Sequence, residues 1–240
     1  MLCCRPLAAL ADHFFTAKDL TLRDDPDEWK IVAAHARVKL EDLLGVRQVH
    51  GAGVAVASTD RPCPWSSPEA DAIVSNDPSV ALAVKVADCV PILLADDTGR
   101  AVAAIHAGWR GTAKRAAIAG VEALQAVYGV RPERLTAAIG PCIGPCCYEV
   151  GDEVPEALRA AGHHPDILGT WFTRGDDGRL RLDLWRATRD QLEGSGVLPA
   201  HVHVSELCTK THASTFHSYR MSGPAAGRLL GVIRAAPAGA

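Results

Sequence analysis

Two apolar runs between residues 80 and 108 constrain the fold more than any other part of this chain. The first, VALAVKVADCVPILLAD, is rich in β-branched residues, and the second, RAVAAIHAG, follows after a short polar turn. Continuous apolar runs of this composition are typical of buried strands. Pro91 lacks the N–H that a strand ladder needs, so it favours a sheet edge or a strand end near Asp88 and Cys89. The chain is therefore expected to fold around a β-sheet.

The other expected elements mix strands and helices without a strict βαβ rhythm. Strands are predicted at 45–58, 80–96, 100–108, 134–140 and 201–209, and helices at 25–45, 112–129, 152–162 and 183–196. The segment 61–72 is rich in proline and serine and predicts a loop, and 174–181 predicts a turn between two short strands. This pattern favours an α+β fold: a single domain over residues 1–240, with a mixed β-sheet core and flanking helices.

Composition and charge exclude several classes of protein. Of the 240 residues, 48% are hydrophobic and 22% are charged, and the net charge of -3 comes without a basic block, so no nucleic-acid partner is expected. The N-terminal MLCCRPLAALADHFF is too short, and too interrupted by Arg5 and Pro6, for a signal peptide or a membrane span. We therefore expect a cytoplasmic protein with no membrane partner, either a monomer or a homodimer.

The eight cysteines of a cytoplasmic chain indicate thiols, metal ligands or catalytic groups before they indicate disulfides. No C-x2-C pair occurs, so a structural zinc finger is not expected. Cys142, Cys146 and Cys147 are interpreted as buried thiols, with a second metal site or a redox role as the alternative.

Three residues at the ends of predicted strands have side chains that ligate metals: His50, Cys89 and His106. Cys89 follows His50 by 39 residues and precedes His106 by 17, which is too far for a local finger. Three neighbouring strands could each deliver one ligand to a common point. Two imidazoles and a thiolate leave a fourth tetrahedral position open, as in catalytic zinc sites. The alternative is that each is an ordinary core residue.

Arginines flank these candidate ligands. Arg47 and Gln48 precede His50, Asp88 precedes Cys89, and Arg110 follows His106 by four residues. A guanidinium near a metal suits phosphate or another anion. Alternatively, the two arginines form structural ion pairs with Asp71 or Asp88.

Five motifs along the chain resemble those of the laccase-domain family, also called the YfiH-type multicopper polyphenol oxidase or purine nucleoside phosphorylase family. They are RQVHG, VADCVPILLADDTGRAVAAIHAGWRGTA, IGPCIGPCCYEVGDEV, LDLWRATRDQL and CT…FHSYR…GR. The resemblance implies a CNF/YfiH-like fold and a Zn²⁺ site at His50, Cys89 and His106, with copper as the alternative metal. It also implies phosphorolysis of adenosine, inosine, guanosine and methylthioadenosine, with adenosine deamination as a further activity. Purine nucleosides and phosphate are then the expected partners.

Further site residues match the family motifs. Tyr148 and Glu149 stand in CCYEVG, and Ser218 and Arg220 stand in FHSYR. Asp88 and Glu149 are candidate catalytic residues that move a proton, although a structural tie to a nearby strand is equally compatible with Glu149. Cys89 is a candidate catalytic residue as metal ligand or nucleophile. Arg47, Gln48, Arg110, Tyr148, Ser218 and Arg220 are candidate contacts to substrate or phosphate. Trp109 is interpreted as a core residue rather than a platform for a base.

The chain departs from the family pattern in three places. The segment TAKDLTLRDDPDEW is short and lacks the usual Asn-Leu pair, TFHSYRM replaces a double Phe and a double Arg, and PAAGR lacks the usual acidic approach to Gly-Arg. These changes touch possible pocket walls, so they affect substrate preference rather than the metal ligands.

Two other enzyme classes compete with this interpretation. Copper oxidation of phenols needs several H-x-H pairs, and the chain has one, at 201–203. A metal-free cysteine hydrolase would use Cys89 as nucleophile and His50 or His106 as base. A conventional zinc nucleobase deaminase is excluded, because its H-x-E and P-C-x-x-C motifs are absent.

Overall fold

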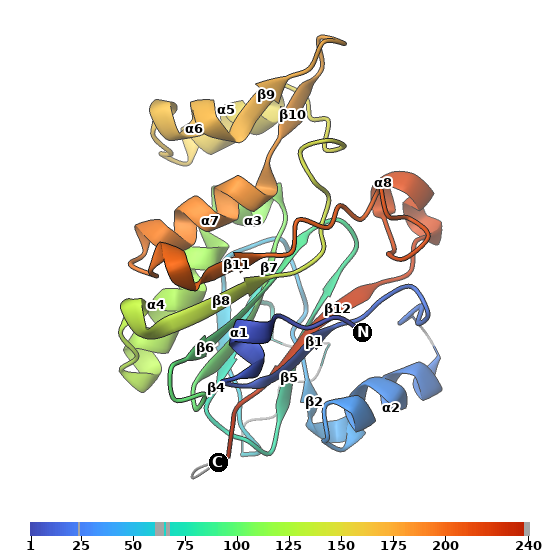
Figure 1. Ribbon diagram of the computed structural model, residues 1–240, viewed down its shortest axis with the longest axis vertical. Coiled ribbons are helices and arrows are strands. Elements are labelled where there is room, and N and C mark those ends of the chain that lie inside the picture. The colour runs from blue at the N-terminus through green and yellow to red at the C-terminus, as the bar shows by residue number, and fades with distance from the viewer. Residues whose placement is uncertain (24, 61–64, 66–67, 238–240) are drawn as a thin grey trace.

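The structure is a computed structural model that describes residues 1–23, 25–60, 65 and 68–237. Two mixed β-sheets form its centre (Figure 1). The larger sheet has the order β11 (Val202–Val204), β8 (Leu135–Ile139), β6 (Val90–Asp96), β7 (Val102–Ala107), β4 (Ala72–Ser75) and β3 (Val54–Val56). The smaller has the order β1 (Asp12–Phe15), β12 (Leu229–Arg234), β5 (Ala81–Val86) and β2 (Leu43–Leu44).

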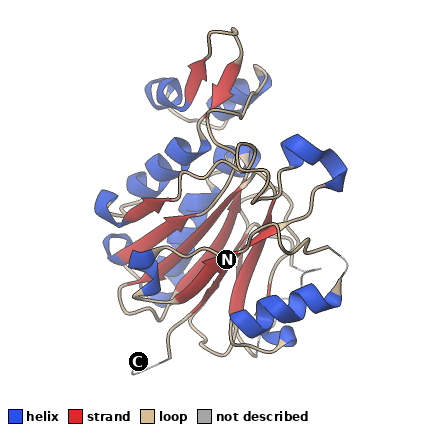
Figure 2. Ribbon diagram, turned by 45° about the vertical axis from the view of Figure 1, so that its right-hand side comes forward, coloured by secondary structure: helices blue, strands red, loops and turns tan. Residues whose placement is uncertain are grey.

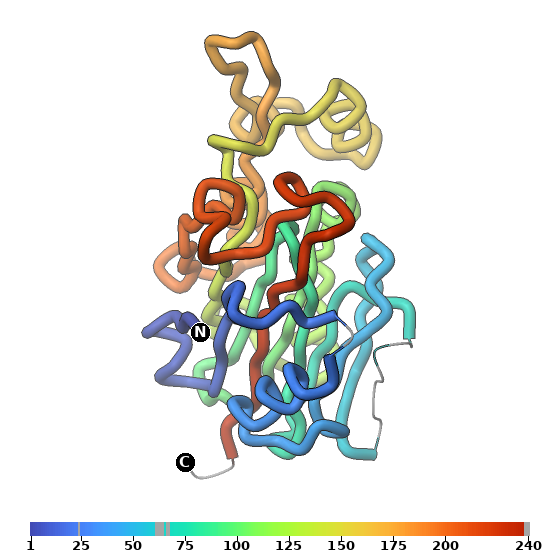
Figure 3. Tube along the Cα trace, turned by 90° about the vertical axis from the view of Figure 1, so that its right-hand side faces the viewer, coloured from blue at the N-terminus to red at the C-terminus, as the bar shows by residue number. Residues whose placement is uncertain are grey.

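Some helices cover the outer faces of these sheets, and others lie beyond the sheets (Figure 2). They are α1 (Arg5–Ala8), α2 (Pro26–His35), α3 (Trp109–Ala113), α4 (Ala116–Tyr128), α5 (Glu153–Ala160), α6 (Pro165–Trp171), α7 (Leu184–Gly194) and α8 (Tyr219–Ser222). α4 and α7 cover the larger sheet, and α2 covers the smaller one. With α5 and α6, the hairpin of β9 (Phe172–Arg174) and β10 (Leu180–Leu182) projects from one end of the molecule (Figure 3).

The central strands β5, β6 and β7 are buried on both faces, which explains their largely unbroken apolar sequences. In β5, Leu82 and Val84 pack between the two sheets, whereas Ala81 and Ala83 face α2. Successive side chains of a strand point to opposite faces, so a strand sandwiched between two layers must be apolar at every position. The larger sheet is covered by helices on one side and by the smaller sheet on the other.

The predicted mixed α/β fold with flanking helices is confirmed, and most predicted elements form. The strands at 100–108 and 134–140, the helices at 152–162 and 183–196, and the hairpin turn at 174–181 are present with small changes of length. The sheet core is divided into two sheets rather than one. No helix of the described residues has both the length and the apolarity to cross a membrane.

The predicted elements at 25–45 and 45–58 are wrong in extent. The helix ends at His35, because Arg37 takes a left-handed φ of 58°, and the chain continues as a 3-10 turn and as β2. Most of 45–58 is loop, and only β3 is a strand. The prediction for 201–209 is also too long, since β11 ends at Val204. The predicted loop at 61–72 falls partly outside the described residues.

The run at 80–96 forms two strands in different sheets. β5 belongs to the smaller sheet and β6 to the larger, and Asp88, with a φ of 81°, turns the chain between them. Pro91 stands near the start of β6, which is a central strand. The predicted strand end near Asp88 and Cys89 is therefore confirmed, and the alternative of a sheet edge is wrong. The predicted helix at 112–129 is likewise divided into α3 and α4 by Arg115, whose φ is 64°.

Candidate metal centre and active site

The structure brings the three predicted metal ligands together. The ligand atoms of His50, Cys89 and His106 all lie within 4.8 Å of one another. Cys89 lies in the turn before β6, His106 lies near the end of β7, and His50 lies in the loop between β2 and β3. The expectation that three neighbouring strands deliver them is wrong for His50, because a tight loop rather than a strand presents it.

A buried carboxylate holds the His50 loop in place. The side chain of Asp71, just before β4, is fully buried. Its oxygens accept hydrogen bonds from the backbone N–H groups of Val49, His50 and Gly51, at 3.3, 2.9 and 2.5 Å. His50 has a φ of 55°, which is uncommon for a residue other than glycine. The three hydrogen bonds stabilise this conformation and so position the first ligand.

The same carboxylate orients the third ligand. Oδ1 of Asp71 lies 2.8 Å from Nδ1 of His106. A carboxylate in this position fixes the imidazole ring and makes it a better ligand. Burial lowers the pKa of His106, but Cys89 and Asp71 outweigh that effect and raise the pKa to about 9. The alternative in which Asp71 pairs with Arg47 or Arg110 is wrong, because its oxygens bind His106 and the loop.

The surroundings of Cys89 favour the thiolate. Burial raises the pKa of Cys89, yet His106 and His50 together lower it to about 6. The thiolate is the form that binds a metal or attacks a substrate. A Cβ at Gly108 would lie 2.7 Å from Sγ of Cys89, so only glycine leaves room for the sulfur there. Gly111, within α3, has no such constraint.

A cavity of about 460 Å³ opens beside the three ligands. This volume lies within the range of about 300–1,000 Å³ that small-molecule sites occupy. Three cationic side chains, Arg47, Lys85 and Arg228, line it, together with the aromatic rings of Trp65 and Tyr219. The cavity therefore combines positive charge, aromatic surface and metal ligands.

Arg47 and Gln48 both line this cavity, and the contact of Arg47 with phosphate stays a prediction. Arg47 forms a salt bridge with Glu69, and not with Asp71 or Asp88. The amide of Gln48 donates to the backbone oxygen of Lys85 and accepts from its N–H, each at 2.8 Å. Gln48 thus ties the His50 loop to β5, and its contact with substrate stays a prediction.

Asp88 is buried, and both of its carboxylate oxygens accept hydrogen bonds. Oδ1 accepts from Oγ1 of Thr209 at 2.5 Å, and Oδ2 accepts from the backbone N–H of Arg220 at 2.6 Å. Ser218 is buried as well, and its Oγ accepts from the N–H of Met221 at 3.2 Å and caps α8. Asp88 and Ser218 therefore position the segment that carries Arg220. Their direct part in chemistry stays a prediction.

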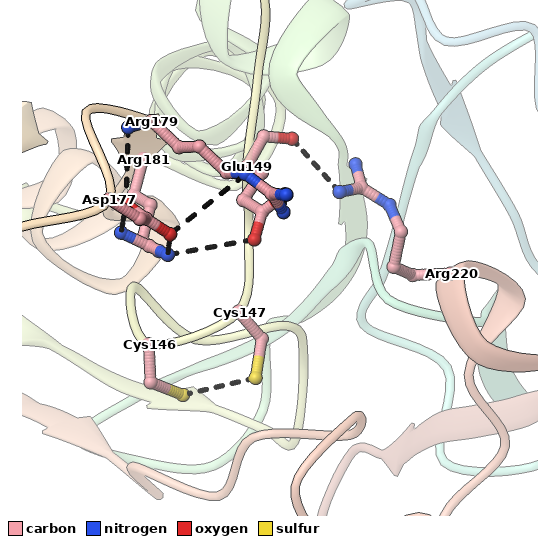
Figure 4. Close-up of polar contacts among 7 residues, drawn as sticks. All are labelled: Cys146, Cys147, Glu149, Asp177, Arg179, Arg181 and Arg220. Carbon is pink, nitrogen blue, oxygen red and sulfur yellow. Dashed lines mark hydrogen bonds and ion pairs between the residues drawn. The ribbon is translucent and has the colours of Figure 1, made fainter. Parts of the chain in front are cut away.

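The carboxylate of Glu149 points toward Arg179 and Arg181 (Figure 4). Its carboxylate forms ion pairs with Arg179 and Arg181 of the β9–β10 hairpin, at 2.8 and 3.5 Å. Its backbone oxygen accepts from Nη1 of Arg220 at 2.9 Å. These contacts support the structural alternative for Glu149, and its proton-transfer role stays a prediction.

Tyr148 contacts Arg220 and is influenced electrostatically by Cys89. The guanidinium of Arg220 lies 5.3 Å from its ring centroid. Burial, and then the negative charge of Cys89, raise the pKa of Tyr148, so its hydroxyl is protonated at neutral pH. Arg110 stacks on Trp109, 4.2 Å from the ring centroid, and acts electrostatically on Tyr148. Trp109 itself packs against the core, as predicted.

Sequence reasoning missed three residues of this site: the orienting acid Asp71 and the cavity cations Lys85 and Arg228. Lys85 is the one charged residue in the apolar run VALAVKV, and Arg228 is the arginine of the Gly-Arg motif. Both cavity residues could therefore have been identified from the sequence. The orienting role of Asp71 could not have been identified in this way, because the sequence around Asp71 does not show that its hydrogen-bond partners lie 20 to 35 residues away.

Comparison with known proteins agrees with this geometry. Residues 23–236 match the family described as multi-copper polyphenol oxidoreductase laccase. The chain belongs to this family. The resemblance drawn from its motifs is therefore confirmed.

Relatives within the laccase family carry names that refer to purine nucleosides. A purine nucleoside phosphorylase of Deinococcus radiodurans is 41% identical over 222 residues, which cover 89% of this chain and 81% of that protein. Adenosine deaminase RL5, from an unknown prokaryotic organism, is 37% identical over 82% of this chain and 76% of its own length. The crystal structure of YlmD from Geobacillus stearothermophilus has a TM-score of 0.83 and 30% identity, over 97% of this chain and 94% of YlmD.

Membership of the laccase family and the geometry of His50, Cys89 and His106 together indicate metal binding. The likeness to YlmD also confirms the predicted fold.

Proposed function

We propose that this chain is a zinc-dependent purine nucleoside phosphorylase. Its substrates would be adenosine, inosine, guanosine and S-methyl-5′-thioadenosine, which react with phosphate to give the free base and the sugar 1-phosphate. The observation that carries this proposal is the cavity of about 460 Å³ in which three cations stand beside His50, Cys89 and His106.

The cavity cations supply what a phosphate anion needs. Arg47, Lys85 and Arg228 lie around one space, and a guanidinium can donate two parallel hydrogen bonds to phosphate oxygens. Burial lowers the pKa of Lys85, and Arg228 lowers it further, so an added anion would be stabilised there. Trp65 and Tyr219 offer aromatic faces on which a purine could stack.

The donor set of His50, Cys89 and His106 fits a catalytic zinc ion. Two imidazole nitrogens, one thiolate and an open fourth position are an arrangement found in catalytic zinc sites. When bound, zinc would supply a Lewis acid that stabilises negative charge on an oxygen. Asp71 would hold His106 and the His50 loop in the ligating geometry.

In phosphorolysis, a phosphate oxygen forms a bond to the sugar C1′ while the bond from C1′ to the purine nitrogen breaks. The electron pair leaves with the base, which then takes up a proton. Asp88 and Glu149 are the proposed proton carriers. Arg110, Tyr148, Ser218 and Arg220 are proposed to contact the substrate or phosphate, with Gln48 and Arg47 on the cavity side.

Adenosine deamination is a second candidate function, favoured by the similarity to adenosine deaminase RL5. In this reaction water attacks C6 of the purine and displaces the amino group as ammonia, which gives inosine, so the same site would need no phosphate. Phenol oxidation with copper is a third candidate function. A multicopper centre needs several H-x-H pairs, however, and the chain has one.

The test combines metal analysis with product analysis. Purified protein is assayed for metal content, then incubated with adenosine, with and without phosphate and a chelator, and the products are separated by chromatography. We expect about one catalytic zinc ion per chain, and adenine with ribose 1-phosphate. Both should be lost in His50→Ala and Cys89→Ala, but not in the control Cys3→Ala, which changes an exposed thiol elsewhere.

Each other outcome points to a different function. Inosine formed without phosphate would establish deamination in place of phosphorolysis. Turnover that survives the chelator but not Cys89→Ala would indicate the metal-free cysteine hydrolase. Zinc binding with no nucleoside turnover would contradict the proposed function altogether. A cytoplasmic location and a monomeric or homodimeric state stay predictions.

A further inference from the structure

Three cysteines outside the candidate active site form a second group of metal-ligand atoms. The sulfurs of Cys146, Cys147 and Cys208 all lie within 4.8 Å of one another. Those of Cys146 and Cys147 are 3.5 Å apart (Figure 4). With zinc–sulfur bonds of about 2.3 Å, thiolates in a tetrahedral site stand about 3.8 Å apart. The cluster is therefore close to the spacing that a single metal ion requires.

The sheet topology brings these thiols together from distant parts of the sequence. Strands β8 and β11 are parallel neighbours, so the segments that follow them leave the same end of the sheet. A bridge between Cys142 and Cys208 continues this pairing. The turn from Gly144 to Cys147 then folds back over Cys208, and the N–H of Gly144 donates to Sγ of Cys208 at 3.2 Å.

Glycine is required at the point of closest approach. A Cβ at Gly144 would lie 2.6 Å from the Trp185 ring and 3.2 Å from Cβ of Cys208. The backbone of the turn therefore lies directly against the third sulfur. Cys142, by contrast, is separately engaged, because its sulfur accepts from the indole N–H of Trp185 at 2.9 Å.

Charge and exposure also suit a bound cation. Three thiolates and one divalent ion carry a net charge of -1, and both Lys210 and Arg181 act electrostatically on Cys147. The interpretation of Cys146 and Cys147 as buried thiols is wrong, because Cys146 is exposed and Cys147 is half-buried. Since Cys208 is buried, an ion can enter from solvent at Cys146 and be held by a fixed ligand.

We propose that Cys146, Cys147 and Cys208 form a second metal site, which binds a thiophilic divalent ion of the zinc type through three sulfurs. The ion would join the segment that carries Tyr148 and Glu149 to the segment that carries Ser218 and Arg220. The ion would thus hold these two loops together beside the candidate active site. This site does not depend on nucleoside activity.

Cadmium titration of the full-length, reduced and metal-free protein tests the second site. Thiolate–cadmium bonds absorb in the near ultraviolet, so the absorbance reports how many sulfurs each ion binds. We expect two ions per chain, one with a single-thiolate signal and one with a signal about three times larger. Cys89→Ser should lose the smaller signal and keep the larger. A competition titration with zinc and a chromophoric chelator gives the affinities.

Cys146→Ser is the decisive variant, because its side chain is exposed and its loss leaves the core intact. It should weaken the second site at least about tenfold, since even the loss of an outer partner of a ligand costs about 10–100-fold in metal affinity. Cys208→Ser should do the same. Cys3→Ser is the matched control, because Cys3 and Cys4 are also adjacent but form no three-ligand group among the described residues.

Three results would overturn the proposal. The first is a single bound ion in the unaltered protein, and the second is an unchanged affinity in Cys146→Ser. The third is equal weakening by Cys3→Ser and Cys146→Ser, which would mean that any adjacent pair of thiols suffices. Failure of the nucleoside assay would leave these measurements unaffected, so the two proposals are separable.

Discussion

Asp71 shows how much one buried side chain can organise at the scale of a residue. It accepts hydrogen bonds from three consecutive N–H groups around His50 and pairs with His106. An unpaired carboxylate would be costly in this fully buried position, and the four partners compensate for that cost. Two of the three metal ligands therefore depend on a residue that does not itself belong to the ligand set.

The first prediction concerns the reactivity of Cys89. In metal-free protein, alkylation of Cys89 by iodoacetamide should increase with pH around a midpoint of about 6, because the lowered pKa produces thiolate above that value and neutral thiol below it. Asp71→Asn should move the midpoint upward. The substitution removes an interaction that raises the pKa of His106, so the imidazolium that stabilises the thiolate is less populated.

Peptide mass spectrometry after timed alkylation measures this profile. Asp77→Asn is the control, because the Asp77 carboxylate binds Thr59 and Ser79, away from the metal ligands. A midpoint that does not change in Asp71→Asn would show that Asp71 has no influence on the thiolate.

At the scale of an element, the C-terminal end of α4 and the interior of α6 show how the position of a glycine in a helix changes its effect on stability. Gly129 ends α4 with a φ of 68°, and its N–H bonds to the backbone oxygen of Gln125 at 2.9 Å. Gly169 lies within α6 without a positive φ. A Cβ at either residue would meet nothing within 4 Å. The two sites therefore differ in backbone conformation and not in packing.

Substitution by alanine should have opposite effects on stability at these two glycines. Gly129→Ala should lower the free energy of unfolding by about 1 kcal/mol, because an L-residue is strained in the left-handed region. Gly169→Ala should raise it by up to about 1 kcal/mol, through the better helix propensity of alanine. Urea unfolding measures both. Equal effects of the two substitutions would mean that helix-end conformation does not control stability here.

At the scale of the whole molecule, the three candidate metal ligands come from segments that belong to different sheets. Cys89 follows β5 of the smaller sheet, His106 ends β7 of the larger sheet, and the His50 loop connects β2 to β3, one from each sheet. A bound ion would therefore link both sheets at one end of their shared core. Metal binding should then stabilise the whole fold and not only the loop.

Chelation should accordingly lower the thermal unfolding temperature. With free zinc at 100 times its dissociation constant, binding contributes about 2.7 kcal/mol, which corresponds to roughly 5–10 °C for a chain of this size. Differential scanning calorimetry with and without a chelator measures the shift. Cys89→Ala should lose most of it and Cys3→Ala should keep it. An equal shift in Cys89→Ala and the unaltered protein would assign the stabilisation to another metal site.

Local sequence was sufficient for the elements that depend on local chemistry. The apolar runs predicted β7 and β8, glycine and helical spacing predicted α7, and the polar turn at 174–181 predicted the β9–β10 hairpin. The ligand set was also readable, because few side chains bind zinc and the motifs containing His50, Cys89 and His106 resemble one family. The breaks within elements were not readable. Arg37 and Arg115 take positive φ values that nothing in their own side chains requires.

The sequence by itself thus determined the fold class, most strands and helices, and the choice of three candidate metal ligands. Only the tertiary structure decided that β5 and β6 belong to different sheets, that Asp71 organises the site, and that Lys85 and Arg228 enter one cavity with Arg47. The reason is physical. Strand periodicity and ligand chemistry are properties of short segments, whereas a hydrogen bond or a shared cavity between residues far apart in the chain exists only once the layers have packed.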